Sequence, residues 1–352
     1  MARISVAFRV DAGPQIGLGH LQRCLALASA LRHLDATCIF LSTEEHQAQT
    51  RIAAFGFQAT GLRHIEPGGP EDANQTCGLA TSQDCDAVVV DSYSATADYL
   101  EHVRRAGLFV VALDDSAGYP FPCQLVVNGG THALQLPYRA LCGNTTFLLG
   151  PTYALLRPEF WDTPPQRVIG GAVHHVLLTV GGADAHNLMP RLLLLLDGVP
   201  GDFILTAIVG PFFQNRMEIE SAVRRCRRPV RLWDAPCSLC DLMREADLAI
   251  SAGGQTLYEL ARVGCPTVAV STASNQDGQL RMFVEAGFVR AVGRADDRGT
   301  LNAIGDVVSS LLWDQDTRAA LSSAGQELVD GQGALRVAQA IVTACSAAAT
   351  TG

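Results

Sequence analysis

The sequence predicts an α/β protein made of two similar halves, each with a parallel sheet. Short runs of β-branched and apolar residues alternate with helical patterns along the whole chain. This alternation is typical of a parallel sheet covered by helices. It breaks once, in RPEFWDTPPQRVIGG (residues 157–171), which has three prolines and two glycines and no sustained period. We interpret this stretch as the linker between the domains.

Each half contains five predicted strands, most of them followed by a polar or glycine-rich turn. In the first half they are Ile4–Val10, Thr37–Leu41, Ala87–Val90, Phe109–Leu113 and Leu125–Val127, and in the second half Val176–Val180, Phe203–Val209, Val230–Trp233, Leu248–Ile250 and Thr267–Val270. Ligands bind at the carboxyl ends of parallel strands, so these turns are candidate sites. We expect an N-terminal domain over 1–157, a linker over 158–171 and a C-terminal domain over 172–352, with a frayed tail after Ala344.

Composition excludes several classes of function. The chain has 352 residues, 48% hydrophobic and 17% charged, with a net charge of -9. The longest basic cluster is RRCRR at 224–228, so we expect neither a nucleic acid nor a membrane partner. The first residues already resemble a strand and no apolar run approaches the ~20 residues that span a bilayer, so we expect a cytoplasmic protein.

The cysteines indicate a reduced interior. There are eleven, an odd number without framework spacing, which favours free core thiols over disulfides. The one CxxC, Cys237 to Cys240, has no second pair or histidines after it. We therefore expect no structural metal.

The stretch FRVDAGPQIGLGHLQRCLALA, from Phe8 to Ala28, joins a strand, a glycine-rich turn and a helix. Gly17 and Gly19 permit backbone geometry that a side chain blocks, and the helix that starts near His20 offers unpaired N–H groups to an anion. Such a turn can seat a phosphate. His20 adds acid/base chemistry, because imidazole has a reference pKa of ~6.5.

Two further turns of this type follow strands of the second half. In TVGGADAHN, the strand reaches Gly181 and Gly182, and Asp184 or Asn187 can cap the next helix. In LAISAGGQT, the strand ends in Ser251, Ala252, Gly253 and Gly254, and a helix runs through Arg262 until Gly264 and Pro266 stop it. Glu259 of that helix either reaches ribose hydroxyls or is a solvated surface glutamate.

A single glycine turn is equally well explained as a tight strand-to-helix connection. Three at equivalent strand ends favour a nucleotide diphosphate held by backbone amides and helix dipoles in a cleft between the domains, with no metal required. A nicotinamide dinucleotide is a weaker alternative. Gln22 stands where the third glycine of GxGxxG belongs, although Glu44 and Glu45 follow the next strand as that fold requires.

Several motifs together resemble the UDP-sugar hydrolases of pseudaminic acid biosynthesis. They are RVDAGPQIGLGHLQRCLALA, VVVDSY (88–93), LDD (113–115), LLGPTYALLR (148–157), TVGGAD and SAGGQTLYEL, in the same order from about residue 4 to about residue 335. The resemblance implies a glycosyltransferase B architecture, with two Rossmann-like domains facing across a cleft, in which water replaces the sugar acceptor. It also implies the substrate UDP-2,4-diacetamido-2,4,6-trideoxy-β-L-altropyranose, hydrolysed to UDP and the free sugar.

The resemblance also implies roles for single residues. His20 is expected to take a proton from water as UDP departs, Tyr93 and Asn275 to orient the sugar, and Asp11 to tune His20. The amides of Gly181, Gly182, Gly253 and Gly254 are expected to stabilise charge on the diphosphate. No cofactor is expected, and a monomer is favoured.

Other interpretations of these residues stay open. His20 can cap a helix, Tyr93 can pack at a domain face and Asn275 can close an Asx turn. Asp114 and Asp115 either cap a turn or act as acid and base. Gln255, where a small hydroxyl residue is expected, and Ser92-Tyr93-Ser94, where His-Tyr-Gly is more usual, depart from the family pattern. A transferase related to the peptidoglycan GlcNAc transferase and a catalytically silent nucleotide-sugar binding protein remain alternatives.

Overall fold

The computed structural model describes residues 3–13, 19–43, 46–141, 143–162, 167–236 and 238–351. The chain divides into two compact units, of which the first contains 1–158 and 331–352 and the second contains 159–330. Gly17, Glu44, Glu45 and Cys237 lie outside the described residues, so the expectations attached to them stay predictions.

Unit 1 contains a parallel sheet whose described strands have the order β3-β2-β1-β4-β5-β6-β7. The strands are β1 (Ser5–Val10), β2 (Thr37–Thr43), β3 (Gln58–Leu62), β4 (Ala87–Asp91), β5 (Phe109–Leu113), β6 (Leu125–Asn128) and β7 (Thr146–Leu149). The helices are α1 (Gly19–His33), α2 (His46–Ala54), α3 (Pro70–Ser82), α4 (Ala97–Arg105) and α12 (Gly333–Thr351), with short 3-10 turns η1 (Ala133–Gln135) and η2 (Pro151–Tyr153). The five strands predicted for this half are all present, while β3 and β7 were not predicted.

Unit 2 contains a second parallel sheet, with its described strands in the order β10-β9-β8-β11-β12-β13. The strands are β8 (His175–Thr179), β9 (Ile204–Val209), β10 (Val230–Asp234), β11 (Leu248–Ala252), β12 (Thr267–Ser271) and β13 (Val289–Arg294). The helices are α5 (Leu188–Asp197), α6 (Arg216–Arg225), α7 (Cys240–Glu245), α8 (Thr256–Val263), α9 (Asp277–Glu285), α10 (Thr300–Leu311) and α11 (Gln315–Leu328), with η3 (Pro158–Phe160) at the start of the unit and η4 (Ser274–Gln276) after β12. Again the five predicted strands are present, and β13 is additional.

Both sheets have a reversal of strand order next to their first strand. In unit 1, β1 pairs with β2 on one side and with β4 on the other. In unit 2, β8 likewise lies between β9 and β11. Connections leave such a strand pair in opposite directions, which opens a crevice at the carboxyl ends of the two strands. The folds therefore offer two crevices, after β1 and β4 and after β8 and β11.

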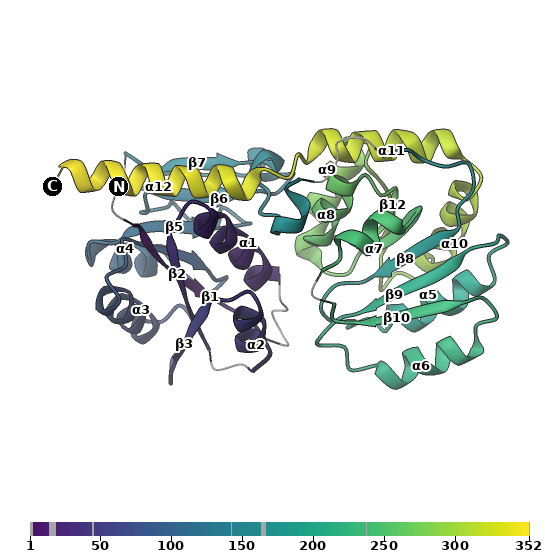
Figure 1. Cartoon of the computed structure of the whole chain (residues 1–352), viewed down its shortest axis with the longest axis horizontal. Coiled ribbons are helices and arrows are strands. Elements are labelled where there is room, and N and C mark those ends of the chain that lie inside the picture. The colour runs from purple at the N-terminus through teal and green to yellow at the C-terminus, as the bar shows by residue number, and fades with distance from the viewer. Residues whose placement is uncertain are drawn as a thin grey trace. The chain divides into compact units, whose positions relative to one another are not determined.

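The C-terminal segment corrects the predicted domain boundary and the predicted fraying. Residues 331–352 belong to unit 1 rather than to the second domain, and α12 continues to Thr351. Figure 1 shows this yellow helix lying beside α1, with which it is in contact. Its buried side chains recur at helical spacing and are Ala334, Val337, Ala338, Ile341 and Cys345. This apolar stripe, packed against unit 1, is the physical reason that the tail is helical.

The predicted linker packs on unit 2 in its described parts. Arg262 of α8 donates to the backbone oxygens of Phe160 and Trp161, at 3.0 and 3.1 Å. Arg318 of α11 donates to those of Gly170 and Gly171, at 2.7 and 2.8 Å. Buried guanidinium groups thus bind backbone oxygens in the described parts of this segment. The chain passes from unit 1 to unit 2 at Pro158 and returns to unit 1 after Asp330.

Candidate active site

His20 is the second residue of α1 and lies at the carboxyl ends of β1 and β4. The pairing of β1 with β4 sets Val10 beside Asp91, so the end of β1 lies next to the end of β4. The Nδ1 atom of His20 lies 2.5 Å from Oδ1 of Asp91. Both side chains are buried, with 6% of His20 and none of Asp91 exposed. The structure therefore adds a carboxylate partner for His20 that the sequence did not single out.

Asp91 is ionised in the folded protein. Burial opposes its charge, but the charges of Arg23 and His20 and the hydrogen bonds that both donate hold its pKa well below the usual range. An ionised carboxylate can only accept hydrogen bonds, so the proton between the two groups is on Nδ1 of His20. In the neutral imidazole tautomer with its proton on Nδ1, the lone pair of Nε2 is the proton acceptor.

Arg23 fixes the position of this carboxylate. Its Nε and Nη2 atoms donate to the two oxygens of Asp91, both at 2.6 Å, in a bidentate pair. Its Nη1 atom donates to Oδ1 of Asp115 at 2.7 Å. Burial alone disfavours the cation, but Asp115 and Asp91 raise the pKa of Arg23 well above its usual value. One turn of α1 carries both His20 and Arg23, three residues apart, so they lie on the same helix face.

Tyr93 joins the same cluster from the turn after β4. Its ring meets the His20 ring edge-on, with 4.4 Å between centroids and an interplanar angle of 87°. Its hydroxyl donates to Oδ2 of Asp115 at 3.2 Å. Tyr93 is also 60% exposed. Two of the residues predicted to act together, His20 and Tyr93, are therefore in contact.

Asp11, which is expected to tune His20, pairs with an arginine. Its carboxylate accepts from Nη1 of Arg9 at 2.6 Å, whereas the carboxylate that contacts His20 is that of Asp91. Arg9 is fully buried and makes a bidentate pair with Asp72 of α3, at 2.6 and 2.8 Å. Asp11 is thus part of a buried ion network that ties the end of β1 to α3, and its expected influence on His20 stays a prediction.

The crevice of unit 2 contains the two glycine turns. Gly181 has a φ of +96°, a conformation that side chains disfavour, which explains a glycine after β8. Asp184, as one of the two predicted capping residues, accepts from the N–H groups of Leu188 and Met189 at the start of α5, at 2.7 and 2.8 Å. Gly182 follows Gly181 directly and is partly exposed, as is Gly254 after β11.

Three expectations for the second turn need correction or refinement. The N–H of Gly253 donates to the oxygen of Val270 at 3.0 Å, so it extends the sheet and is not available to a phosphate. Ser251 is buried and its hydroxyl donates to the oxygen of Ala252 at 3.0 Å. Glu259 is only 7% exposed, which rules out the solvated surface glutamate. The amide of Gly254, just before α8, remains this turn's candidate for binding a phosphate.

Asn275 lies on the exposed turn η4, in unit 2. Neighbouring side chains link this turn to the two glycine turns: Nε2 of Gln279 donates to the oxygen of Gly253 at 2.8 Å, and Nε2 of His186 lies 2.9 Å from the oxygen of Thr272. Asn275 therefore belongs to the same edge of the sheet as the glycine turns. His20, Tyr93, Asp11 and Gly19 belong to unit 1.

No group of three or more metal-ligating side chains occurs in a suitable arrangement within the described parts of the chain. None of the described helices combines the length and the hydropathy that crossing a bilayer requires.

The fold is that of the glycosyltransferase B proteins. The crystal structure of MurG from Acinetobacter baumannii aligns with 96% of this chain and 99% of its own, with a TM-score of 0.69 and 14% sequence identity. At that identity the likeness establishes the fold alone. No protein-family model matches the chain.

Within this fold class, the sequence is similar to proteins named as UDP-2,4-diacetamido-2,4,6-trideoxy-β-L-altropyranose hydrolases. The Campylobacter jejuni hydrolase is 20% identical over 81% of this chain and 98% of its own length. The spore coat polysaccharide biosynthesis protein SpsG of Bacillus subtilis is 23% identical over 94% of this chain and 96% of its own. An uncharacterized protein of Methanocaldococcus jannaschii is 24% identical over 75% of this chain, but the match spans only 55% of that protein. The family resemblance seen in the motifs is confirmed.

Proposed function

We propose that this protein hydrolyses a UDP-sugar, UDP-2,4-diacetamido-2,4,6-trideoxy-β-L-altropyranose, to UDP and the free diacetamido sugar in the synthesis of a nonulosonic acid. The observation that carries the proposal is the His20–Asp91 pair at the carboxyl edge of the first sheet. A distant relationship to hydrolases that bear the name of this substrate supports the choice of sugar. A cytoplasmic location and a monomeric state are parts of the same proposal.

In the proposed reaction, the oxygen of water forms a bond to the anomeric carbon as the bond from that carbon to the diphosphate breaks. The electron pair of the broken bond leaves with UDP, and a proton of the water moves to Nε2 of His20. Asp91 stabilises the imidazolium that results. This single displacement inverts the anomeric centre.

The charges around His20 favour the transfer of a proton from water to its ring. Unit 1 contains two ion clusters in which carboxylates outnumber guanidinium groups: Arg9 pairs with Asp11 and Asp72, and Arg23 pairs with Asp91 and Asp115. An excess of negative charge stabilises both an imidazolium and a sugar ring that becomes positive in the transition state. The geometry is therefore suited to generating a cation at this place.

The diphosphate is assigned to unit 2. The amides of Gly181, Gly182 and Gly254 and the amino end of α8 lie at the crevice between β8 and β11, where a helix dipole favours an anion. Glu259, in the first turn of α8, is the candidate partner of the ribose hydroxyls. These groups stabilise the leaving UDP without a metal ion in this proposal.

Proton NMR of the diacetamido UDP-sugar, incubated with the protein alone, tests the proposal. We expect UDP and the free sugar of inverted configuration to appear without any acceptor. We expect His20→Ala to lower the rate by about 10²- to 10⁴-fold, the range typical of a lost general base, while UDP affinity is retained. Unchanged turnover of the variant would remove His20 from the mechanism.

A glycosyltransferase is the second candidate, favoured by the MurG-like fold. It predicts that the UDP-sugar stays intact with the protein until an acceptor is added. A silent binding protein predicts UDP affinity with no turnover under either condition. The NMR experiment, run with and without a lipid-linked sugar acceptor, separates these three functions.

A further inference from the structure

Asp115 is a carboxylate of the unit 1 cluster that the proposed proton transfer does not use. Its two oxygens have different partners: Oδ1 accepts from Arg23 at 2.7 Å and Oδ2 accepts from Tyr93 at 3.2 Å. The side chain is 34% exposed, whereas that of Asp91 on the other side of Arg23 is fully buried. Asp115 is thus held rigidly but still open to a ligand.

The neighbouring carboxylate shows what a purely structural role looks like here. Asp114 accepts from the N–H groups of Ser116 and Ala117, at 2.9 and 2.7 Å, and from the hydroxyl of Tyr138 at 2.7 Å. These bonds close the turn after β5. Of the two adjacent aspartates, Asp114 therefore caps the turn, and Asp115 is the one that contacts the residues around His20.

We propose that Asp115 is a specificity residue that accepts a hydrogen bond from an N–H or O–H group of the sugar. This inference rests on the proposed function. A carboxylate oxygen accepts more than one hydrogen bond, so each oxygen keeps a lone pair after binding its protein partner. Arg23 and Tyr93 fix both oxygens, and Tyr93 contacts the His20 ring, so a sugar whose anomeric carbon faces His20 has this acceptor beside it.

The chemistry of the acceptor sets the class of ligand. An ionised carboxylate repels phosphate and the carboxylates of acidic sugars but binds neutral donors. Acetamido N–H groups and ring hydroxyls are such donors, and a site built to bond a donor rejects an analogue that lacks it. Asp115 therefore selects a neutral, donor-bearing hexose.

The main rival is that Asp115 only holds Arg23, and through it Asp91 and His20. A substrate series separates the two roles. We would measure kcat and KM for the wild-type protein and Asp115→Asn with the diacetamido UDP-sugar and with three analogues, in which the 2-acetamido, the 4-acetamido or the 3-hydroxyl group is replaced by hydrogen.

If Asp115 contacts the sugar, Asp115→Asn lowers kcat/KM by about 10- to 100-fold for the full substrate, as expected for a lost hydrogen bond to a charged group. For the one analogue that lacks the contacted donor, the same substitution has less than about a 3-fold effect. Asp114→Asn is the matched control. It is expected to lower thermal stability and to leave the ranking of the four substrates as in the wild type.

Each of the other outcomes contradicts either the role proposed for Asp115 or the proposed function. An equal loss of kcat/KM on all four substrates, or a shifted pH profile with unchanged discrimination, means that Asp115 acts through Arg23 and not on the sugar. If Asp115→Asn keeps the wild-type kcat/KM on all four substrates, Asp115 neither contacts the sugar nor acts through Arg23. A wild-type protein that is inert toward the full substrate and all analogues overturns the proposed function, and this inference with it.

Discussion

One carboxylate, Asp91, holds together the candidate active site of unit 1. It accepts from the ring of His20, from two nitrogens of Arg23 and from the thiol of Cys24, which lies 3.4 Å from Oδ2. Each donor comes from a single helix, α1, whereas the acceptor comes from β4. The orientation of the imidazole therefore depends on one residue that lies 71 positions away in the sequence.

Replacing this carboxylate by an amide is expected to remove catalysis while leaving the binding of UDP. In Asp91→Asn the uncharged side chain no longer fixes the proton on Nδ1 and no longer stabilises an imidazolium, so we predict a fall in kcat of about 10²- to 10⁴-fold. Steady-state kinetics measure the loss. Asp86→Asn, at the exposed other end of β4, is the control and should keep the wild-type kcat. Equal activity of both variants would contradict the assigned role of Asp91.

The lowered pKa of Asp91 also predicts how stability depends on pH. A carboxyl group whose pKa is depressed on folding contributes stability that is fully present above its unfolded pKa of ~3.9 and is lost as the pH falls toward the folded value. The wild-type protein should thus lose this contribution below about pH 4. Melting temperatures between pH 7 and pH 3 test it. The difference in melting temperature between the wild type and Asp91→Asn should become smaller at low pH. A difference that stays constant from pH 7 to pH 3 would contradict this prediction.

At the scale of elements, buried strands were predictable from sequence and edge strands were less so. The ten strands predicted from their apolar runs are present. The three additional ones, β3, β7 and β13, lie at sheet edges, where exposed positions interrupt the apolar run, as the burial of VRAVGR shows. A strand solvated on one side has a weaker hydrophobic pattern than a central strand of a parallel sheet.

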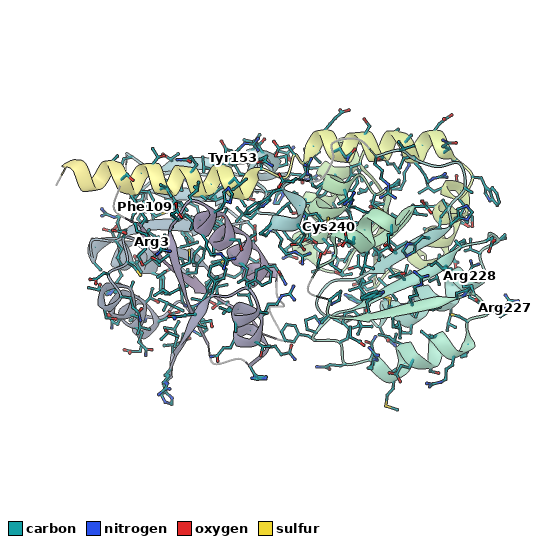
Figure 2. The ribbon with its side chains drawn as sticks, viewed as in Figure 1. Arg3, Phe109, Tyr153, Arg227, Arg228 and Cys240 are labelled. Carbon is teal, nitrogen blue, oxygen red and sulfur yellow. The ribbon has the colours of Figure 1, made fainter. Side chains whose placement is uncertain are left out.

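The start of α12 gives a prediction at this scale. A Cβ added at Gly333 would lie 2.3 Å from the oxygen of Ala154, and it would also approach Tyr153, which Figure 2 labels beside the helix. Backbone atoms cannot yield easily, so Gly333→Ala should displace α12 from unit 1 and destabilise it by about 1–3 kcal/mol.

The matched control is Gly78→Ala, inside α3 of the same unit. No atom lies within 4 Å of a Cβ added there, and the position is exposed. Alanine in an exposed helix interior is more favourable than glycine, so this variant should be more stable by about 0.5–1 kcal/mol. Urea unfolding of both variants, followed by circular dichroism, measures the two changes. Equal stability of the two variants would mean that α12 is not docked as described.

For the whole molecule, the motifs predict where the candidate site lies but not which side chains contact one another in it. The glycine turns and His20 were visible because a strand, a turn and a helix are adjacent in sequence. Asp91 and Arg23 acquire their roles only when β4 pairs with β1, a contact between segments far apart in the chain. The return of α12 to unit 1 was missed for the same reason, although the apolar spacing from Ala334 to Cys345 was present in the sequence. Local patterns thus identify elements, and long-range packing decides which side chains meet.

In the proposed reaction, a water molecule activated by His20 attacks the anomeric carbon of a UDP-sugar. Hydrolysis of the diacetamido UDP-sugar in heavy-oxygen water, followed by mass spectrometry of an early quenched sample, tests this most directly. We expect the heavy oxygen to enter the free sugar and UDP to be released without it, because the bond between the anomeric carbon and the diphosphate oxygen breaks. Heavy oxygen in the terminal phosphate of UDP would mean attack at phosphorus and would contradict the proposed attack at carbon.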